Sequence, residues 1–235
     1  MATQFDPGRV RLICLDIDGT LADTDDAFVV QLARGLGFLR LASRLEPLRL
    51  ARWLVMRFES PATALITTVD RLGLDEVAAP LDSLWHRWRG EASSRGFRLI
   101  AGVLPALTVL HHRYPLAIVT ARSARNAAAF LQQFQLEGIF ACVATAGTCR
   151  RTKPDPASLL WTAQQLGVAP AYCLMVGDTT VDILAGRRAG AQTMGVLCGF
   201  GERGELERAG ADVILESTAD LPAALGLSVH RTGTN

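Results

Sequence analysis

The sequence predicts an α/β protein with a doubly wound parallel sheet and a helical segment inserted after the first strand. Short, continuous apolar runs, typical of strands buried on both faces, alternate with helix-like stretches along most of the chain. Alternating strands and helices form parallel sheets that are covered on both sides. The alternation stops only once, directly after the first run, where helical patterns continue for about 75 residues without a convincing strand.

Six apolar runs are expected to form the strands, and four longer stretches the helices between them. The strands are expected at residues 10–15, 116–120, 140–145, 172–176, 193–197 and, more weakly, 212–215. The helices are expected at residues 103–113, 123–135, 156–166 and 181–189. Ligands of such sheets bind outside the carboxyl ends of the strands, so the residues that follow each strand are the functional candidates.

The insert divides the chain into a core of residues 1–21 and 99–235 and an α-helical cap of residues 22–98. Pro47, Pro61 and Pro80 mark breaks between its helices. Because the insert follows the first strand, we expect it to lie over the strand ends, where a lid would sit.

Composition excludes several classes of protein. The 235 residues carry a net charge of +1, which argues against a nucleic-acid-binding protein with a basic face. No run of about 18 apolar residues predicts a transmembrane helix. The N-terminus lacks an apolar signal core, and the five cysteines form no CxxC pair, so we expect a cytoplasmic protein without structural zinc.

Acidic residues follow two of the predicted strands. Asp16 and Asp18 come directly after the first, and alternation in an extended chain points both toward the crevice. Asp178 follows the strand at 172–176, and Asp182 lies in the first turn of the next helix. Either motif alone is also typical of an ordinary turn or a capped helix. Together they bring costly like charges to one edge, and an all-oxygen set favours Mg²⁺.

Two further features suit an anion. Thr120 ends the second strand, before a helix whose free backbone amides, from Ala121 onward, can bind phosphate. Lys153 is the only lysine among 24 basic residues and is expected at the start of another helix. Its charge, together with Mg²⁺, would offset most of the four carboxylates.

At these residues the sequence resembles the haloacid dehalogenase-like hydrolase superfamily, and within it the phosphoglycolate-phosphatase-like members with a helical cap. The resemblance implies a Rossmann-like core. The matching segments are Asp16-Ile17-Asp18-Gly19-Thr20-Leu21, the strand ending in Thr120, Lys153-Pro154-Asp155-Pro156, and Gly177-Asp178-Thr179-Thr180-Val181-Asp182.

The resemblance implies a role for each carboxylate. Asp16 would be the nucleophile that forms an aspartyl-phosphate, and Asp18 the general acid and then the general base. Asp16, Asp178 and the backbone carbonyl of Asp18 would hold Mg²⁺. Asp182 would orient the water molecules of the metal rather than bind it directly.

The resemblance also implies how the phosphoryl group is held. Thr120, the Ala121 amide and Lys153 would contact its oxygens. Capped phosphatases often have Asn where this chain has Ala121, followed by a basic residue. Arg122 could contact the phosphate or leaving group, or could be a solvated charge.

Three other patterns are given structural interpretations. Residues 199–204 match the dinucleotide fingerprint GxGxxG, but they come late in the chain, so we expect a glycine-rich loop. The arginine-rich stretch 34–57 is expected to be a cap helix rather than a membrane contact. Trp53, Trp85 and Trp88 are expected to pack inside the cap.

The sequence therefore predicts a Mg²⁺-dependent phosphatase for a small phosphorylated metabolite, as a monomer or homodimer. A phosphomutase or pyrophosphatase shares the same core residues and remains an alternative. A catalytically silent partner-binding protein is the alternative of another class, although such a protein has no reason to keep clustered charges.

Overall fold

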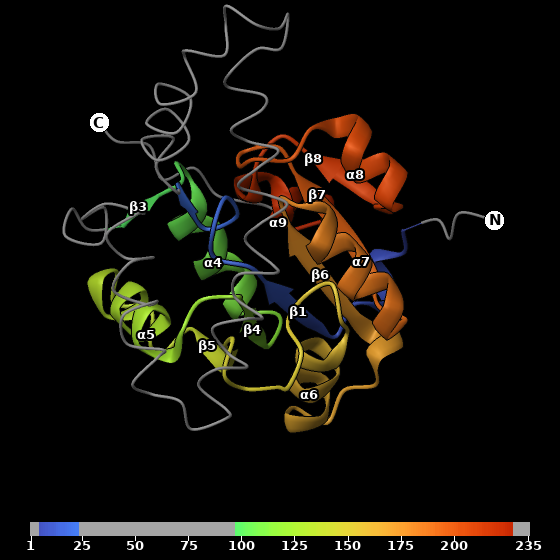
Figure 1. Cartoon of the computed structure of the whole chain (residues 1–235). Coiled ribbons are helices and arrows are strands. Elements are labelled where there is room, and N and C mark those ends of the chain that lie inside the picture. The colour runs from blue at the N-terminus through green and yellow to red at the C-terminus, as the bar shows by residue number, and fades with distance from the viewer. Residues whose placement is uncertain (1–4, 24–96, 228–235) are drawn as a thin grey trace, which may run out of the picture. The chain divides into compact units, whose positions relative to one another are not determined.

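The computed structural model describes residues 5–23 and 97–227 (Figure 1). The chain divides into two units, residues 1–23 with 98–235 and residues 24–97. The arginine-rich stretch and the three tryptophans assigned to the cap lie outside the described residues, so those interpretations remain predictions. The first unit contains the sheet and every candidate site residue.

A six-stranded, wholly parallel sheet forms the centre of this unit, in the order β5-β4-β1-β6-β7-β8. All six expected strands are confirmed, with ends that differ from the expected ones by at most two residues. The strands are β1 (Leu12–Leu15), β4 (Leu116–Val119), β5 (Phe140–Ala144), β6 (Cys173–Gly177), β7 (Gln192–Val196) and β8 (Val213–Leu215). The sheet places β1 and β6 side by side at its centre.

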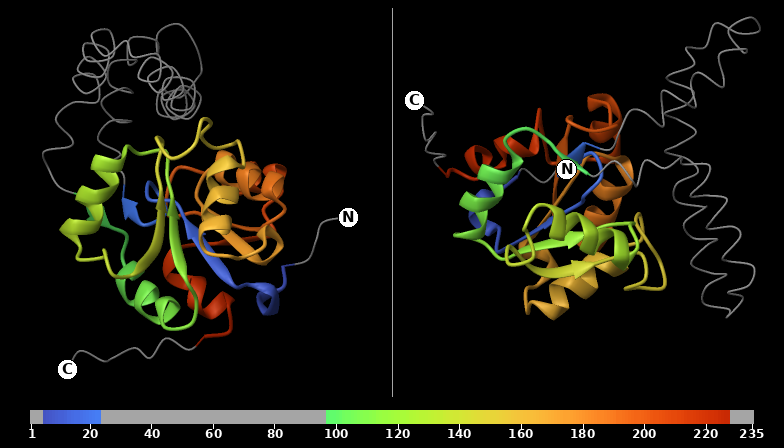
Figure 2. Two further views of the ribbon diagram at one scale, coloured as in Figure 1. Left: turned by 90° about the horizontal axis from the view of Figure 1, so that it is seen from below. Right: turned by 90° about the vertical axis from the view of Figure 1, so that its left-hand side faces the viewer.

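Helices cover both faces of the sheet, as in a doubly wound fold (Figure 2). The α-helices are α4 (Val103–His111), α5 (Ala124–Gln133), α6 (Ala157–Gln165), α7 (Thr180–Ala189), α8 (Arg203–Ala209) and α9 (Leu221–Ala224). Short 3-10 helices are η1 (Pro7–Arg9), η4 (Pro170–Tyr172) and η5 (Thr218–Asp220). The four helices expected between strands are confirmed, again to within two residues.

Local sequence signals explain where these helices begin and end. The Ser123 hydroxyl accepts a hydrogen bond from the amide of Asn126 and caps α5. Thr179 and Asp182 form a capping box at the start of α7. Gly190 ends the same helix in the left-handed conformation that glycine adopts without strain.

The core lies on both sides of the central strands. Leu12 and Cys14 of β1 are buried in a cluster with Leu159 of α6. The alternate residues Ile13 and Leu15 are also fully buried, and they face the other side of the sheet. Burial on both faces explains why these strands are continuous apolar runs in the sequence.

A second, two-stranded antiparallel sheet lies at the base of the insert. It pairs β2 (Ala22–Asp23) with β3 (Arg98–Leu99). No strand was expected between residues 22 and 98, so the structure corrects the prediction at both ends of this segment. Two-residue strands have too few positions to show alternation, which is why pattern alone misses them.

The described helices include none that combines the length and apolar character needed to cross a membrane. All five cysteines lie in the described part of the chain, and none of them forms a disulfide there. Cys14 and Cys173 are buried within strands, which agrees with their interpretation as small apolar side chains.

Candidate active site

The two central strands deliver the acidic residues to one edge of the sheet. β1 and β6 are parallel neighbours, with Leu15 opposite Val176. Asp16 and Asp178 therefore lie at the same edge of the sheet, each directly after the last residue of its strand. Asp16, Asp178 and Asp182 each offer a carboxylate oxygen within 4.8 Å of the others, and all three are buried.

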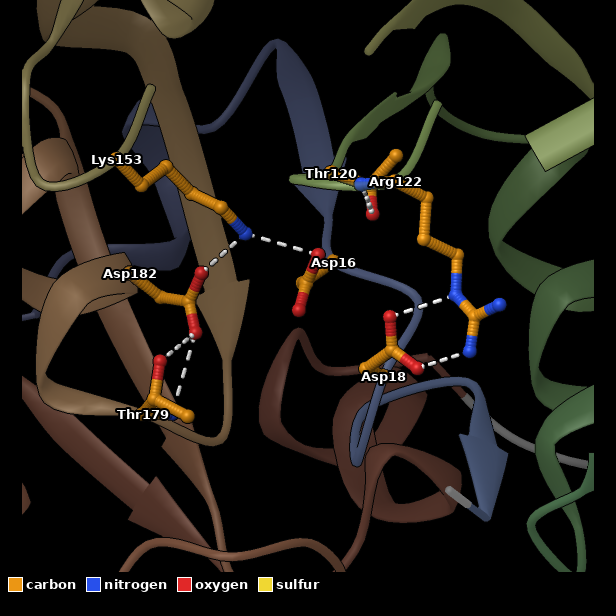
Figure 3. A network of polar contacts seen from close by, with 7 residues as sticks. All are labelled: Asp16, Asp18, Thr120, Arg122, Lys153, Thr179 and Asp182. Carbon is orange, nitrogen blue, oxygen red and sulfur yellow. Dashed lines mark hydrogen bonds and ion pairs between the residues drawn. The ribbon is translucent and has the colours of Figure 1, made fainter. Parts of the chain in front are cut away.

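Lys153 lies inside this cluster and bridges two of its carboxylates (Figure 3). Its Nζ is 2.8 Å from Oδ1 of Asp16 and 2.6 Å from Oδ1 of Asp182. The lysine is only 6% exposed, so these contacts form away from water. Lys153 lies in the loop before α6, four residues ahead of Ala157, rather than at the start of the helix.

Asp182 is held on both of its oxygens. Oδ1 pairs with Lys153, and Oδ2 accepts hydrogen bonds from the backbone amide and the hydroxyl of Thr179 at 3.1 and 2.6 Å. A Cβ at Gly177 would come within 2.3 Å of the Asp182 side chain. Gly177 therefore makes room for Asp182 at the end of β6, which explains the Gly-Asp-x-x-x-Asp pattern.

Asp178 is fully buried, and its two oxygens differ. Oδ2 accepts a hydrogen bond from the backbone amide of Phe200 at 2.7 Å. Oδ1 has no hydrogen-bond partner among the described residues. A buried carboxylate oxygen without a partner is costly, so this atom is available to a ligand.

Burial and crowding disturb the ionisation of this cluster. Burial raises the pKa of Asp16 to about 7, with Lys153 opposing the shift and Asp182 and Asp18 adding to it. Burial also raises the pKa of Asp178, and the negative charges of Asp182 and Asp16 raise it further. Burial alone would lower the pKa of Lys153, but its two carboxylate partners outweigh that effect and raise it.

The charge balance and the donor atoms fit a divalent cation. With all three clustered carboxylates ionised, Lys153 leaves a net charge of −2, which one divalent cation would balance. The donors are all oxygens, which Mg²⁺ prefers, and Oδ1 of Asp178 accepts no hydrogen bond from the part of the chain that the structure describes. Asp16 and Asp178 could hold such an ion.

Asp18 lies apart from the three clustered carboxylates. Its two oxygens are bonded by Nε and Nη2 of Arg122, with an Nε–Oδ2 distance of 2.7 Å (Figure 3). The two side chains are 22% and 21% exposed. The structure thus pairs Asp18 with a cation at the rim, whereas the sequence suggested only that like charges surround it.

Thr120 and Ala121 directly follow β4, the neighbour of β1 in the sheet. Thr120 is buried just beyond β4, and its Oγ1 accepts a hydrogen bond from the backbone amide of Arg122 at 3.2 Å. A hydroxyl that accepts in this way can still donate its own proton. Half-buried Ala121 follows in the turn before α5, which begins at Ala124, so it precedes the helix rather than belonging to it.

Sequence reasoning missed the neighbours that hold these side chains. The pairing of Arg122 with Asp18 joins residues 104 positions apart, and the Phe200 amide contacts Asp178 across 22. The sequence signal that could have indicated the contact between Phe200 and Asp178 is the glycine-rich pattern at 199–204, because close backbone approach requires glycine.

A parallel doubly wound sheet with a buried charged cluster at its carboxyl edge defines a Rossmann-like α/β enzyme. The family model of the haloacid dehalogenase-like hydrolases matches residues 13–196. The chain belongs to this family, as its four motifs suggested. The expected class, a phosphoric monoester hydrolase of this family, is confirmed.

Individual proteins show the same likeness. The phosphoglycolate phosphatase of Escherichia coli (strain K12) is 28% identical over 236 residues, which cover 93% of this chain and 93% of the bacterial enzyme. A hydrolase of Pseudomonas syringae superposes with a TM-score of 0.68 and 26% identity, covering 93% of this chain and all of that one. A β-phosphoglucomutase of Clostridium difficile shares the fold, with a TM-score of 0.65, 20% identity and coverage of 90% and 93%.

Proposed function

We propose that the protein is a Mg²⁺-dependent phosphatase that hydrolyses a small phosphorylated metabolite through an aspartyl-phosphate on Asp16. The observation that carries the proposal is the buried contact of Lys153 with both Asp16 and Asp182, next to an Asp178 oxygen that has no hydrogen-bond partner within residues 5–23 and 97–227. Phosphoglycolate is the first substrate to test, because the E. coli relative that matches nearly the whole chain is a phosphoglycolate phosphatase.

In the first step, Asp16 attacks the phosphorus atom. Lys153 contacts Oδ1 of Asp16, so Oδ2 is the oxygen not engaged by the lysine. As the bond from this oxygen to phosphorus forms, the bond to the leaving oxygen breaks, and protonated Asp18 gives its proton to that oxygen. The products are the free alcohol and the aspartyl-phosphate.

In the second step, water attacks the aspartyl-phosphate and Asp18 accepts a proton from it. The bond between Asp16 and phosphorus breaks, inorganic phosphate leaves, and Asp16 returns as a carboxylate. Nε of Arg122 donates a hydrogen bond to Oδ2 of Asp18 and holds this carboxyl group beside Asp16. Because the pair is partly exposed, Arg122 can turn to an incoming anionic substrate.

The phosphoryl oxygens would be held by groups on both sides of Asp16. Lys153 supplies a positive charge, Thr120 a hydroxyl proton, and Ala121 a backbone amide in the turn before α5. Asp16, Asp178 and the backbone carbonyl of Asp18 would hold Mg²⁺, which would supply positive charge to the phosphoryl group. Asp182 has both oxygens engaged within the chain, which supports an indirect role toward the metal.

A phosphatase screen tests the proposal. Phosphate release from p-nitrophenyl phosphate, phosphoglycolate, sugar phosphates, nucleotides and pyrophosphate is measured with Mg²⁺ and with EDTA. We expect release that requires Mg²⁺ and is abolished by Asp16→Asn while the fold is retained. No turnover on any compound would contradict the proposal and favour a partner-binding protein.

The phosphomutase alternative and three other expectations from the sequence remain predictions. A phosphomutase has the same core residues, and the likeness to β-phosphoglucomutase shows that the fold does not separate the two. Transfer of the phosphoryl group to a sugar phosphate instead of water would identify a mutase. Cytoplasmic location, the helical cap at residues 22–98 and a monomeric or homodimeric state are likewise predictions.

A further inference from the structure

The glycine-rich segment 199–204 lies against the candidate metal site. It connects β7, which ends at Val196, to α8, which begins at Arg203. The sequence of this segment matches a nucleotide-binding fingerprint, but in the structure two of its glycines have a different role. Gly199 allows the backbone to approach the carboxylate of Asp178, and Gly201 allows it to approach the carbonyl oxygen of Asp178.

Positions 199 and 201 require glycine because a side chain would not fit there, and not because of their backbone conformation. A Cβ at Gly199 would lie 2.1 Å from Oδ2 of Asp178 and 2.5 Å from the carbonyl oxygen of Gly19. A Cβ at Gly201 would lie 1.9 Å from the carbonyl oxygen of Asp178. Neither glycine has a positive φ, so only this close approach explains them.

Contacts with the loop after β1 fix the segment from its other side. The thiol of Cys198 lies 3.4 Å from the carbonyl oxygen of Gly19. A Cβ at Gly19 would itself lie 2.2 Å from Oδ2 of Asp178. Thr218 donates a hydrogen bond of 2.6 Å to the carbonyl oxygen of buried Thr20. The loops after β1 and β7 therefore enclose Asp178 between them.

The enclosed carboxylate is asymmetric. The amide of Phe200 donates to Oδ2 at 2.7 Å, while Oδ1 has no hydrogen-bond partner among the described residues. A carboxylate fixed through one oxygen cannot rotate freely, so it presents the other oxygen in one direction. Such outer contacts commonly set the orientation of a metal-binding carboxylate.

We propose that the Phe200 amide, held in place by Gly199 and Gly201, is a positioning group that makes Asp178 bind Mg²⁺ through Oδ1 alone. The inference rests on the proposed magnesium site and concerns how this chain tunes it. Mg²⁺ demands a compact octahedral shell, whereas Ca²⁺ accepts bidentate carboxylates and flexible geometry. A carboxylate limited to one oxygen therefore favours Mg²⁺ over Ca²⁺.

The sharpest test removes only the hydrogen-bond donor. An amide-to-ester replacement at Phe200, made by incorporating the corresponding α-hydroxy acid, exchanges the N–H for oxygen and keeps the side chain. Binding of Mg²⁺ and of Ca²⁺ to the full chain is measured by calorimetry without substrate. We expect Mg²⁺ affinity to fall about 10- to 100-fold, and Ca²⁺ affinity to fall much less, so that selectivity for Mg²⁺ declines.

Glycine substitutions give a second measurement with a matched control. Gly199→Ala forces the loop away from Asp178, so we expect the same loss of selectivity. Gly204→Ala lies in the same motif, and no described atom comes within 4 Å of its new Cβ, so metal binding should be unchanged. Thermal unfolding without metal shows whether each variant folds, and an unfolded Gly199→Ala protein would leave the ester variant as the test.

The outcomes separate this inference from the proposed function. If the unmodified protein binds no Mg²⁺, the proposed magnesium site itself is wrong. If it binds Mg²⁺ but the ester variant shows unchanged affinity and selectivity, the positioning role of Phe200 is wrong. An equal loss of Mg²⁺ and Ca²⁺ binding would also overturn it, because a merely structural role would weaken both ions alike.

Discussion

The site contains two ion pairs that differ mainly in their access to water. On the β6 side, the Lys153 side chain is 5% exposed, and its partners Asp16 and Asp182 are 10% and 0% exposed. On the β4 side, Arg122 and Asp18 form a pair in which both side chains are about one-fifth exposed. The first pair is enclosed by strand ends and loops, whereas the second lies at the rim.

The difference in exposure to water indicates a different role for each ion pair. A buried charge that loses its partner cannot be solvated by water instead, and this is costly. Lys153, Asp16 and Asp182 therefore keep a fixed geometry. A partly exposed pair contributes little to stability and can exchange partners at low cost. We therefore expect changes on the β6 side to affect both chemistry and stability, and changes on the β4 side to affect mainly chemistry.

The largest effect is expected for Lys153→Arg. The ammonium fits between two carboxylates in a buried space, whereas a planar guanidinium needs more room and a forked partner. We expect kcat to fall about 10²- to 10³-fold with a folded protein, as for the loss of one preorganised donor. Steady-state kinetics and thermal unfolding measure both effects. Arg151→Lys, at an exposed position in the same loop, is the control, and near-normal turnover of Lys153→Arg would refute the role of the lone lysine.

Asp182→Asn is expected to lower the free energy of unfolding by about 2 kcal/mol. Lys153 loses one buried partner but keeps Asp16, so the loss should be smaller than for a pair that is fully broken. Chemical denaturation provides the measurement. Glu216→Gln, which removes one charge from an exposed pair with Arg203, should change stability by less than about 0.5 kcal/mol. If both substitutions changed the free energy of unfolding equally, the expected difference in stability between buried and exposed ion pairs would be wrong.

Metal and pH should act together on the β6 side. Burial raises the pKa of Asp16 from 3.8 to about 7 and also raises that of Asp178. Raised carboxyl pKa values favour the fold at low pH, and this contribution is lost as pH rises through about 7 in the metal-free protein. Mg²⁺ binds the ionised form, so a concentration about 100 times its dissociation constant at pH 8 should stabilise the fold by about 2 to 3 kcal/mol there, and by less near pH 5. Thermal unfolding with Mg²⁺ or EDTA tests this, and equal stabilisation at both pH values would contradict it.

Among the substitutions at the candidate site, Arg122→Lys is expected to have the smallest effect on stability. The variant keeps the charge but loses the forked contact with both oxygens of Asp18. We expect kcat/KM to fall about 10-fold, and the free energy of unfolding to change by less than about 1 kcal/mol. A loss of stability as large as that of Asp182→Asn would show that the rim pair supports the fold.

The sheet and the clustering of Asp16, Asp178 and Asp182 at its edge could be predicted from the sequence, because both depend on local patterns. Continuous apolar runs identify strands buried on two faces, and the residues after them must lie at one edge. The partners of those residues were not accessible, because they depend on packing between distant segments. Arg122 was expected at substrate or solvent but pairs with Asp18, and the glycines near Phe200 resembled a nucleotide motif.

The short ribbon of β2 and β3 has a consequence for how such a protein can be altered. Ala22 lies opposite Leu99, so the chain leaves the core and re-enters it one strand spacing away, about 5 Å. A tight turn of a few residues could join these two points without disturbing any strand of the large sheet. We therefore expect that the seventy-odd residues between them can be exchanged as a unit while the candidate site carboxylates keep their places at the edge of the large sheet.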